Sequence, residues 1–121
     1  MSIHMKDGKL HIALVGLRFG GSFSGIYRMH PAVGEVTIVD PDRAVLRSIG
    51  DNYGIARRAT DLEQVLAEPT VDAVHLVTPI PLHARQSIQV LEAGKHCACT
   101  VPAATTIAEL KAIVAAQKAS G

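Results

Sequence analysis

Residues 16–21 form a glycine-rich segment whose residue types and spacing are those of a ligand-binding motif. Gly16 and Gly21 occupy the first and third glycine positions of the pattern G-x-G-x-x-G, directly after an aliphatic run. In this pattern the first glycine makes a tight turn, and the last permits close packing of the following helix against the strand. The free N–H groups of that helix bind a pyrophosphate. The segment therefore predicts a dinucleotide-binding loop. Its candidate contacts are Gly16, Leu17, Arg18, Phe19, Gly20 and Gly21.

Arg18 stands where the pattern expects its middle glycine. That glycine normally lets the backbone approach the pyrophosphate without a side chain in the way. Two outcomes are open. The Arg18 side chain either turns outward and pairs with a phosphate oxygen, or it blocks or loosens the site. A third interpretation is a glycine-rich turn that binds no ligand, because a motif match is a hypothesis until its context supports it.

Asp40 follows a second apolar run, residues 35–39, and supplies the acid that such sites place beside the adenine ribose. A carboxylate there accepts hydrogen bonds from both ribose hydroxyls and repels a 2′-phosphate, so it favours NAD over NADP. Arg43 keeps NADP possible, because a nearby arginine can accommodate the 2′-phosphate. The alternative for Arg43 is a solvated charge on a helix surface.

The elements that must position these residues alternate between strands and helices. Apolar runs predict strands at residues 9–15, 35–39, 55–59, 71–77 and 96–99. Apolar spacing with start and stop signals predicts helices at residues 20–29, 41–53, 62–68, 81–93 and after 106. This alternation implies an α/β fold with a doubly wound parallel sheet, a single-domain Rossmann fold of strand order 3-2-1-4-5. Its ligand is expected at the carboxyl ends of the first and fourth strands.

Two helix ends carry more specific expectations. Pro41 is expected in the first turn of its helix, where its missing N–H costs nothing. The last helix is expected to begin at a capping box formed by Thr106 and Glu109. Its expected buried side consists of Leu110, Ile113 and Val114.

Composition and charge exclude several classes of protein. Twelve Lys and Arg stand against eleven Asp and Glu, so no net field attracts nucleic acid or an anionic membrane, and neither is expected as a partner. The longest apolar stretch, residues 10–17, is far shorter than the ~20 residues of a membrane helix. Residues 1–8 are interpreted as a disordered start or a cloning remnant, and residues 9–121 as an NAD(P)-binding Rossmann domain.

Cys97 and Cys99 are the only cysteines and give no disulfide framework, which predicts a reducing compartment and a cytoplasmic location. With the adjacent His96 they could form part of a metal site. The spacing and the remaining ligands of a zinc site are missing, so buried strand thiols are the preferred interpretation and no metal is expected.

Two further segments carry a family resemblance. One is Thr78-Pro79-Ile80-Pro81-Leu82-His83, and the other runs from Ala93-Gly94-Lys95-His96 to Thr100-Val101-Pro102. Together with the glycine-rich loop they resemble the N-terminal domain of the glucose-fructose oxidoreductase/inositol dehydrogenase (Gfo/Idh/MocA) family over nearly the whole chain. The resemblance implies that Thr78, Pro79 and His83 match a Thr-Pro-Asn-x-x-His segment beside the nicotinamide ribose, with Ile80 replacing its asparagine.

The resemblance also implies a missing catalytic group. The family's Glu-Lys-Pro, whose lysine serves at the catalytic site, is represented by Thr100-Val101-Pro102, and valine can neither donate a proton nor hold a substrate hydroxyl. Lys95 belongs to the turn at the opposite end of the strand, where a solvated charge is expected. His83 is a candidate for chemistry, although a histidine in the first turn of a helix more often packs or caps. The catalytic residues therefore stay unknown.

The resemblance implies an NAD(P)-binding domain of an oxidoreductase that acts on a sugar, cyclitol or similar alcohol. Family members place a second domain after this one, so the chain is interpreted as a fragment in which the C-terminal domain is absent and which is inactive alone. The parent protein is expected to take a small polyol-type substrate and is a possible homo-oligomer. Two alternatives stay open: a nucleotide-sensing or binding module without dehydrogenase activity, and a Rossmann domain for another adenosyl ligand.

Overall fold

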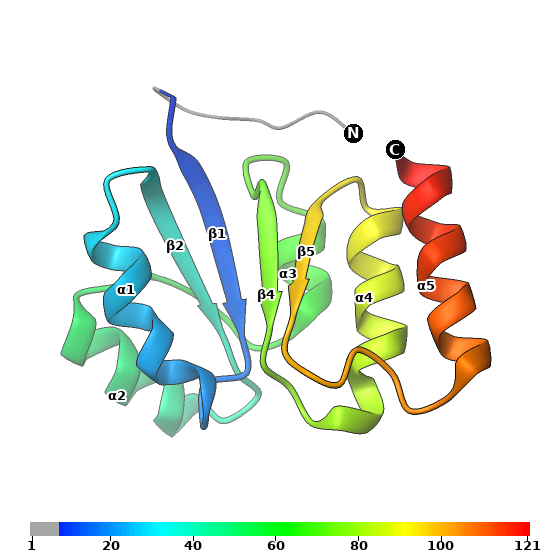
Figure 1. Ribbon diagram of the computed structural model, residues 1–121. Coiled ribbons are helices and arrows are strands. Elements are labelled where there is room, and N and C mark those ends of the chain that lie inside the picture. Colours follow the sequence, from blue (N-terminus) through cyan, green and yellow to red (C-terminus); the bar gives the residue numbers. More distant parts are fainter. Residues whose placement is uncertain (1–7) are drawn as a thin grey trace.

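Five parallel strands form one twisted sheet in the order β3-β2-β1-β4-β5, as the sequence predicts (Figure 1). The computed structural model describes residues 8–121, so the interpretation of residues 1–7 lies outside the described part. The strands are β1 (Leu10–Val15), β2 (Val33–Val39), β3 (Arg57–Ala59), β4 (Ala73–Leu76) and β5 (His96–Cys99). Because all the strands run the same way, their carboxyl ends meet at one edge, which lies at the bottom of Figure 1.

Helices cover the two faces of the sheet and complete the Rossmann layers. The helices are η1 (Gly20–Ser22), α1 (Phe23–Met29), α2 (Arg43–Tyr53), α3 (Leu62–Leu66), η2 (Ile80–Leu82), α4 (His83–Glu92) and α5 (Ile107–Ser120). One apolar cluster joins β1 and β2 to α1 and α2, through residues such as Leu14, Ile38 and Leu46. A second cluster, around Val74 and Val90, lies on the opposite face with α3 and α4. Successive side chains of a strand point to opposite faces, so both clusters draw on the same strands.

The α2 helix begins later than the sequence indicated. Pro41 precedes the helix, and Asp42 is its N-cap, accepting hydrogen bonds from the N–H groups of Ala44 and Val45 at 3.0 and 3.4 Å. The expectation that Pro41 lies in the first turn was therefore wrong. An aspartate cap accepts two N–H groups that the helix leaves unpaired, which explains why it sets the helix start two residues further on.

The α5 helix has its predicted capping box but not its predicted buried side. The Thr106 hydroxyl accepts from the Glu109 N–H, and the Glu109 carboxylate accepts from the Thr106 N–H. Leu110 and Val114 are exposed, however, and Ile113 is only half-buried, because α5 packs on α4 rather than on the sheet. Figure 1 shows α5 outermost beside α4. Across residues 8–121, the structure has no helix with the length and apolar character needed to cross a membrane.

Candidate functional site

The turn after β1 is built on Gly16. Its φ of +93° lies in the left-handed region, and a Cβ on this residue would lie 2.5 Å from the carbonyl oxygen of Val77. The Gly16 N–H also donates to the Val39 carbonyl at 2.9 Å, which ties the turn to the end of β2. Only glycine combines this conformation with so close an approach to the neighbouring strand. The first glycine of the predicted loop therefore occupies a position where a side chain does not fit.

Gly20 and Gly21 bring the following helical segment close to its neighbours. A Cβ on Gly20 would lie 2.9 Å from the Val77 side chain, just beyond β4, and one on Gly21 would lie 2.9 Å from Ile49 of α2. The close approach to the sheet edge thus falls to Gly20, whereas Gly21 serves packing between helices. The sequence had assigned the helix–strand contact to Gly21.

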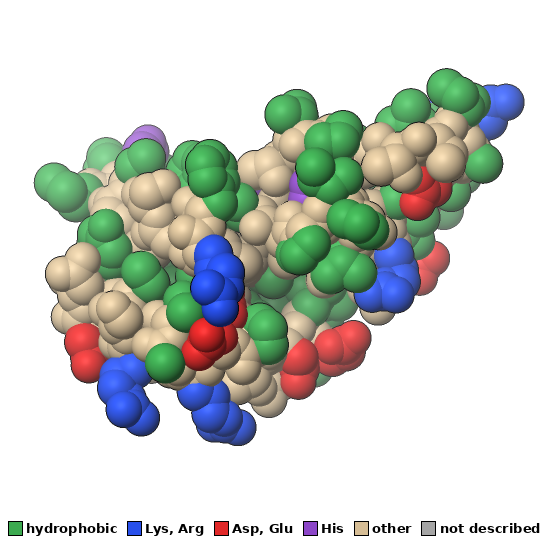
Figure 2. Space-filling model, turned by 90° about the horizontal axis from the view of Figure 1, so that it is seen from below, with side chains coloured by type: hydrophobic (Ala, Val, Ile, Leu, Met, Phe, Trp, Pro, Cys, Tyr) green, Lys and Arg blue, Asp and Glu red, His purple; other side chains and the backbone are tan. Residues whose placement is uncertain are grey.

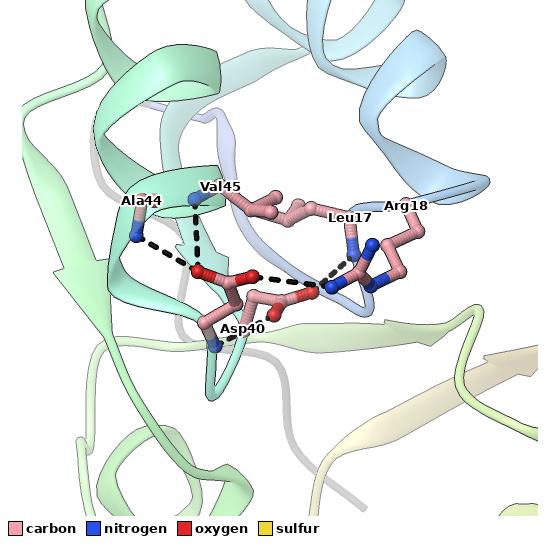
Figure 3. Close-up of polar contacts among 6 residues, drawn as sticks. Leu17, Arg18, Asp40, Ala44 and Val45 are labelled. Carbon is pink, nitrogen blue, oxygen red and sulfur yellow. Dashed lines mark hydrogen bonds and ion pairs between the residues drawn. The ribbon is translucent and has the colours of Figure 1, made fainter.

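Asp40 joins the β1 turn to the β2–α2 turn (Figure 3). Its Oδ2 accepts a hydrogen bond from the Leu17 N–H at 2.9 Å, and its Oδ1 accepts from the Asp42 N–H at 2.9 Å. Asp40 is only 6% exposed. The carboxylate therefore holds two loops in place with both of its oxygens, a role that sequence reasoning did not foresee.

Arg18 extends across to the β2–α2 turn rather than over the glycine-rich loop. Its Nη2 lies 3.1 Å from Asp42 Oδ2, and the Arg18 side chain is 78% exposed (Figure 3). The side chain has thus turned outward toward Asp42, although Arg18 still lines the cavity described below. Phe19 beside it is exposed, and so is Arg43 at the start of α2. Of the predicted contacts, Leu17 is almost fully buried, and its N–H is taken by Asp40.

A cavity of about 550 Å³ opens at the carboxyl edge of the sheet and falls within the size range of small-molecule sites. It is lined by the β1 turn, the end of β2, the β3–α3 turn, the segment after β4 and one side of α4. Gly16, Leu17, Arg18, Asp40, Thr78 and Pro79 all lie on its wall, so the structure brings together most of the predicted contacts. The other predicted contacts, Phe19, Gly20, Gly21, Arg43 and His83, are not part of the cavity wall.

The cavity also has walls that the sequence reasoning missed. Thr60 comes from the β3–α3 turn and Leu62 from the start of α3, whereas Arg85 and Gln86 come from α4. The Gln86 Oε1 accepts a hydrogen bond of 2.5 Å from the Thr78 hydroxyl. Thr60 and Leu62 could have been predicted from the sequence, because every loop at the carboxyl edge of a parallel sheet is a candidate for ligand binding. Arg85 and Gln86 could not, because their place on the wall depends on which side of α4 faces the cavity.

His83 is buried beneath the cavity wall rather than exposed to it. The residue is 1% exposed, and its Nε2 and Nδ1 lie 2.7 Å from the carbonyl oxygens of Thr78 and Pro102. Its two ring nitrogens thus tie the segment after β4 to the segment after β5. This geometry supports the packing interpretation of His83 over the chemical one.

Val101 stands at the opposite extreme, with 89% of its surface exposed. It follows β5 at the carboxyl edge, where the resemblance places a lysine. Figure 2 views this edge from below and shows hydrophobic side chains gathered on the side of α4 and α5. Ile80 and Ile107 are exposed large apolar residues of the same region. Val101 therefore adds apolar surface where the resemblance predicts a polar group.

Lys95, at the opposite end of β5, is not the solvated charge that was expected. It is 5% exposed, and its ammonium group donates to the carbonyl oxygens of Glu68 and Val71 at 2.8 and 2.9 Å. Burial lowers the pKa of Lys95, and the nearby Asp72 and Glu68 oppose that shift. The long side chain reaches back to the loop before β4, so this lysine fastens two segments of the fold.

Cys97, Cys99 and His96 do not converge on a common point. Both cysteines pack against the apolar cluster on the α4 face, whereas His96 is exposed and alternates to the other face of β5. Burial raises the pKa of both thiols. The two cysteines are thus half-buried thiols on one face of β5.

The fold and this edge together define a Rossmann-type dinucleotide-binding domain. Residues 10–121 match the model of the Gfo/Idh/MocA oxidoreductase family, which is described as having an NAD-binding Rossmann fold. The chain belongs to this family and is an NAD-binding domain of it, as the sequence predicted.

Individual relatives agree with this assignment. The chain is 32% identical over 113 residues to 4-carboxy-2-hydroxymuconate-6-semialdehyde dehydrogenase of a Sphingobium species, covering 93% of this chain and 36% of that protein. It is 32% identical over 69 residues to scyllo-inositol 2-dehydrogenase (NADP(+)) IolU of Bacillus subtilis, covering 57% of this chain and 21% of that protein.

A solved structure has the same fold. The WlbA dehydrogenase from Bordetella pertussis, in complex with NADH and UDP-GlcNAcA, matches with a TM-score of 0.84 and 29% identity over 97% of this chain and 34% of that chain. The chain thus spans about a third of the length of WlbA and of the Sphingobium dehydrogenase.

Proposed function

We propose that this chain is the coenzyme half of a nicotinamide-dependent oxidoreductase and binds NAD in the cavity at the carboxyl edge of the sheet. The observation that carries the proposal is the approach of the Gly16 turn to Val77, where a Cβ would lie 2.5 Å from the carbonyl oxygen. So close an approach of the turn to the end of β4 is the role that the first glycine of a dinucleotide-binding loop has in Rossmann sites.

The residues present fit a dinucleotide. The adenosine end would lie between Asp40 and the β3–α3 turn, and the nicotinamide end would lie toward Thr78 and Pro79. When bound, the nicotinamide supplies hydride transfer, whereas the protein supplies binding and orientation. The Gln86 side chain fixes the Thr78 hydroxyl, and His83 fixes the Thr78 carbonyl, so the backbone and side chain of Thr78 are both held.

The substrate class is proposed from the family. Relatives include an inositol dehydrogenase, which supports a sugar, a cyclitol or a similar alcohol as substrate of the parent protein. The apolar surface around Val101 supports a substrate pocket completed by another part of that protein. Two unpaired cysteines support a reducing, cytoplasmic location.

Calorimetric titration of this chain with NAD, NADP and S-adenosylmethionine tests the proposal. We expect a dinucleotide to bind and S-adenosylmethionine not to bind. The Gly16→Ala variant should lose binding, because its Cβ meets the Val77 carbonyl. Gly94→Ala is the matched control, since Gly94 also has a positive φ (+78°) but has no atom within 4 Å of its Cβ position. Binding of S-adenosylmethionine alone would contradict the proposal.

The second candidate function is a nucleotide-binding module without dehydrogenase activity. The exposed Val101 favours it, because the family's acid/base lysine is missing and His83 is withdrawn into the protein. Turnover of NAD by the wild-type parent protein with a polyol would dispose of this candidate. If the wild type is inactive, Val101→Lys tests whether restoring the lysine restores turnover. The exposed position accepts the longer side chain without repacking.

A further inference from the structure

We propose that Gln86 of α4 is a positioning residue of the coenzyme cavity and fixes the Thr78 hydroxyl as a hydrogen-bond acceptor for a neutral donor of the coenzyme. The donor is a hydroxyl or an N–H of the nicotinamide half, either on its ribose or on its carboxamide. The inference rests on the proposed function, since it concerns the nicotinamide end of the same cavity. It gives a role to a wall residue that the sequence pattern does not mark.

The single proton of the Thr78 hydroxyl is taken by Gln86. The Thr78 Oγ1 lies 2.5 Å from the Gln86 Oε1, at the short end of the range for a hydrogen bond between two oxygens. An amide oxygen accepts hydrogen bonds and has no proton to donate, so the hydroxyl is the donor of this pair. Only the lone pairs of the Thr78 oxygen are then left for another partner. Toward a ligand in the cavity, the hydroxyl is therefore an acceptor.

The backbone around Thr78 is held without Gln86. The Thr78 carbonyl oxygen lies 2.7 Å from the Nε2 of His83, which is almost completely buried. The preceding N–H, that of Val77, donates to the Val15 carbonyl at 2.8 Å and so fixes the start of the segment to β1. Replacing Gln86 should therefore release the rotation of the hydroxyl and leave the segment in place.

A fixed acceptor on the cavity wall distinguishes one part of a dinucleotide from another. Thr78 and Gln86 both line the cavity. The oxygens of an ionised pyrophosphate only accept hydrogen bonds, so they find no donor in a hydroxyl whose proton is already taken. Ribose hydroxyls and a carboxamide N–H are donors, and they fit the free lone pairs of the Thr78 oxygen. Without Gln86 the hydroxyl would rotate and donate as well, so this selectivity would be lost.

Calorimetric titration of wild type and Gln86→Leu with NAD, acetylpyridine adenine dinucleotide, ADP-ribose and AMP tests the inference. We expect Gln86→Leu to lower NAD affinity about 5-fold, the effect of one hydrogen bond, and to leave AMP affinity unchanged. AMP lacks the nicotinamide half, so its binding also shows that the variant is folded. ADP-ribose lacks the nicotinamide, and the acetylpyridine analogue lacks the carboxamide N–H. A loss that both of these ligands share identifies a ribose hydroxyl as the donor, and a loss confined to NAD identifies the carboxamide.

Gln86→Glu tests the direction of the hydrogen bond. A carboxylate accepts and cannot donate, so it keeps the Thr78 proton in place. Gln89→Glu is the matched control for the added charge, because Gln89 lies on the same wall about one turn further along α4. We expect the two glutamate variants to bind NAD with equal affinity.

A double-mutant cycle shows whether Gln86 acts through Thr78. Thr78→Val removes the hydroxyl at nearly constant volume, and Gln86→Leu should lower NAD affinity no further in that background. The inference is overturned if wild type binds NAD but Gln86→Leu binds it equally well or loses AMP too. It is also overturned if Gln86→Glu binds NAD more weakly than Gln89→Glu, or if the losses of Thr78→Val and Gln86→Leu add. If wild type binds neither NAD nor AMP, the proposed function itself fails, and the inference fails with it.

Discussion

The His83 Nδ1 lies 2.7 Å from the carbonyl oxygen of Pro102, while the opposite ring nitrogen lies 2.7 Å from the carbonyl oxygen of Thr78. One buried imidazole therefore joins the loops that follow β4 and β5. These loops carry Thr78 on one side and Val101 on the other. The histidine thus sets the spacing between the proposed nicotinamide contact and the position of the missing lysine.

Replacing His83 should destabilise the fold as well as the site. His83→Ala removes both contacts and the one N–H that a neutral imidazole donates, so at least one carbonyl oxygen loses its donor, and we expect a loss of about 1–3 kcal/mol in the free energy of unfolding. Urea denaturation measures it. His83→Gln keeps one polar contact and should lose less. If His83→Ala unfolds at the same urea concentration as wild type, the two short contacts do not stabilise these loops.

Gly16→Ala should cost far more than a positive φ alone explains. A left-handed conformation costs a non-glycine residue about 1–2 kcal/mol. At Gly94 nothing else opposes a Cβ, so Gly94→Ala should lose only that amount. At Gly16 the Cβ also meets the Val77 carbonyl, so the backbone must shift, and we expect a loss of more than about 3 kcal/mol. Equal unfolding free energies for the two variants would refute the close approach.

The sequence was sufficient for the fold because local patterns determine it. Alternating aliphatic runs and helical stripes predicted every strand and the sheet order, and the glycine spacing located the β1 turn. The errors lie where a long side chain reaches across the fold. Lys95 bonds to the carbonyls of Glu68 and Val71, and Arg18 pairs with Asp42. Residue spacing in the sequence predicts neither interaction, because the two partners of each lie in different segments that only the tertiary fold brings together.

Asp40→Asn should weaken both stability and coenzyme binding. An amide offers one oxygen where the carboxylate uses two, so either the Leu17 or the Asp42 N–H loses its acceptor. A buried N–H left unpaired costs about 1–3 kcal/mol. Thermal unfolding and NAD titration measure the two effects. Asp42→Asn is the matched control and should stay within about 0.5 kcal/mol of wild type, since asparagine caps helices as well as aspartate does.

The Lys95→Met variant tests whether Lys95 stabilises the fold through its buried hydrogen bonds or is only a solvated charge. Methionine fills a similar volume but donates no hydrogen bond to Glu68 and Val71. We expect a loss of about 1–3 kcal/mol, because the Val71 carbonyl is left without its donor. A surface charge would change the free energy of unfolding by less than about 0.5 kcal/mol. NAD affinity should not change, since Lys95 lies at the far end of the sheet from the cavity.

Mild acid should destabilise the domain through two histidines on opposite faces of the sheet. His75 lies under Tyr27, whose hydroxyl is 2.8 Å from its Nδ1, and His11 lies between Thr37 and Thr70. Burial lowers the pKa of both from the ordinary value of 6.5; Arg57 lowers that of His11 further, against the weaker opposing effects of Glu35, Asp72 and Glu68. The unfolded chain therefore takes up these protons near pH 6.5, and the folded chain does so only at lower pH.

Stability should consequently fall as the pH drops below 6.5 and level off once it passes the lowered pKa values of the folded state. Urea midpoints at about pH 7.5 and about pH 5.5 measure the fall. His75→Gln and His11→Gln cannot take up the proton, so each variant should lose less stability than wild type between these two pH values. The two effects should add in the double variant, because the histidines share no partner. An undiminished fall in the double variant would show that other groups govern the acid sensitivity of this fold.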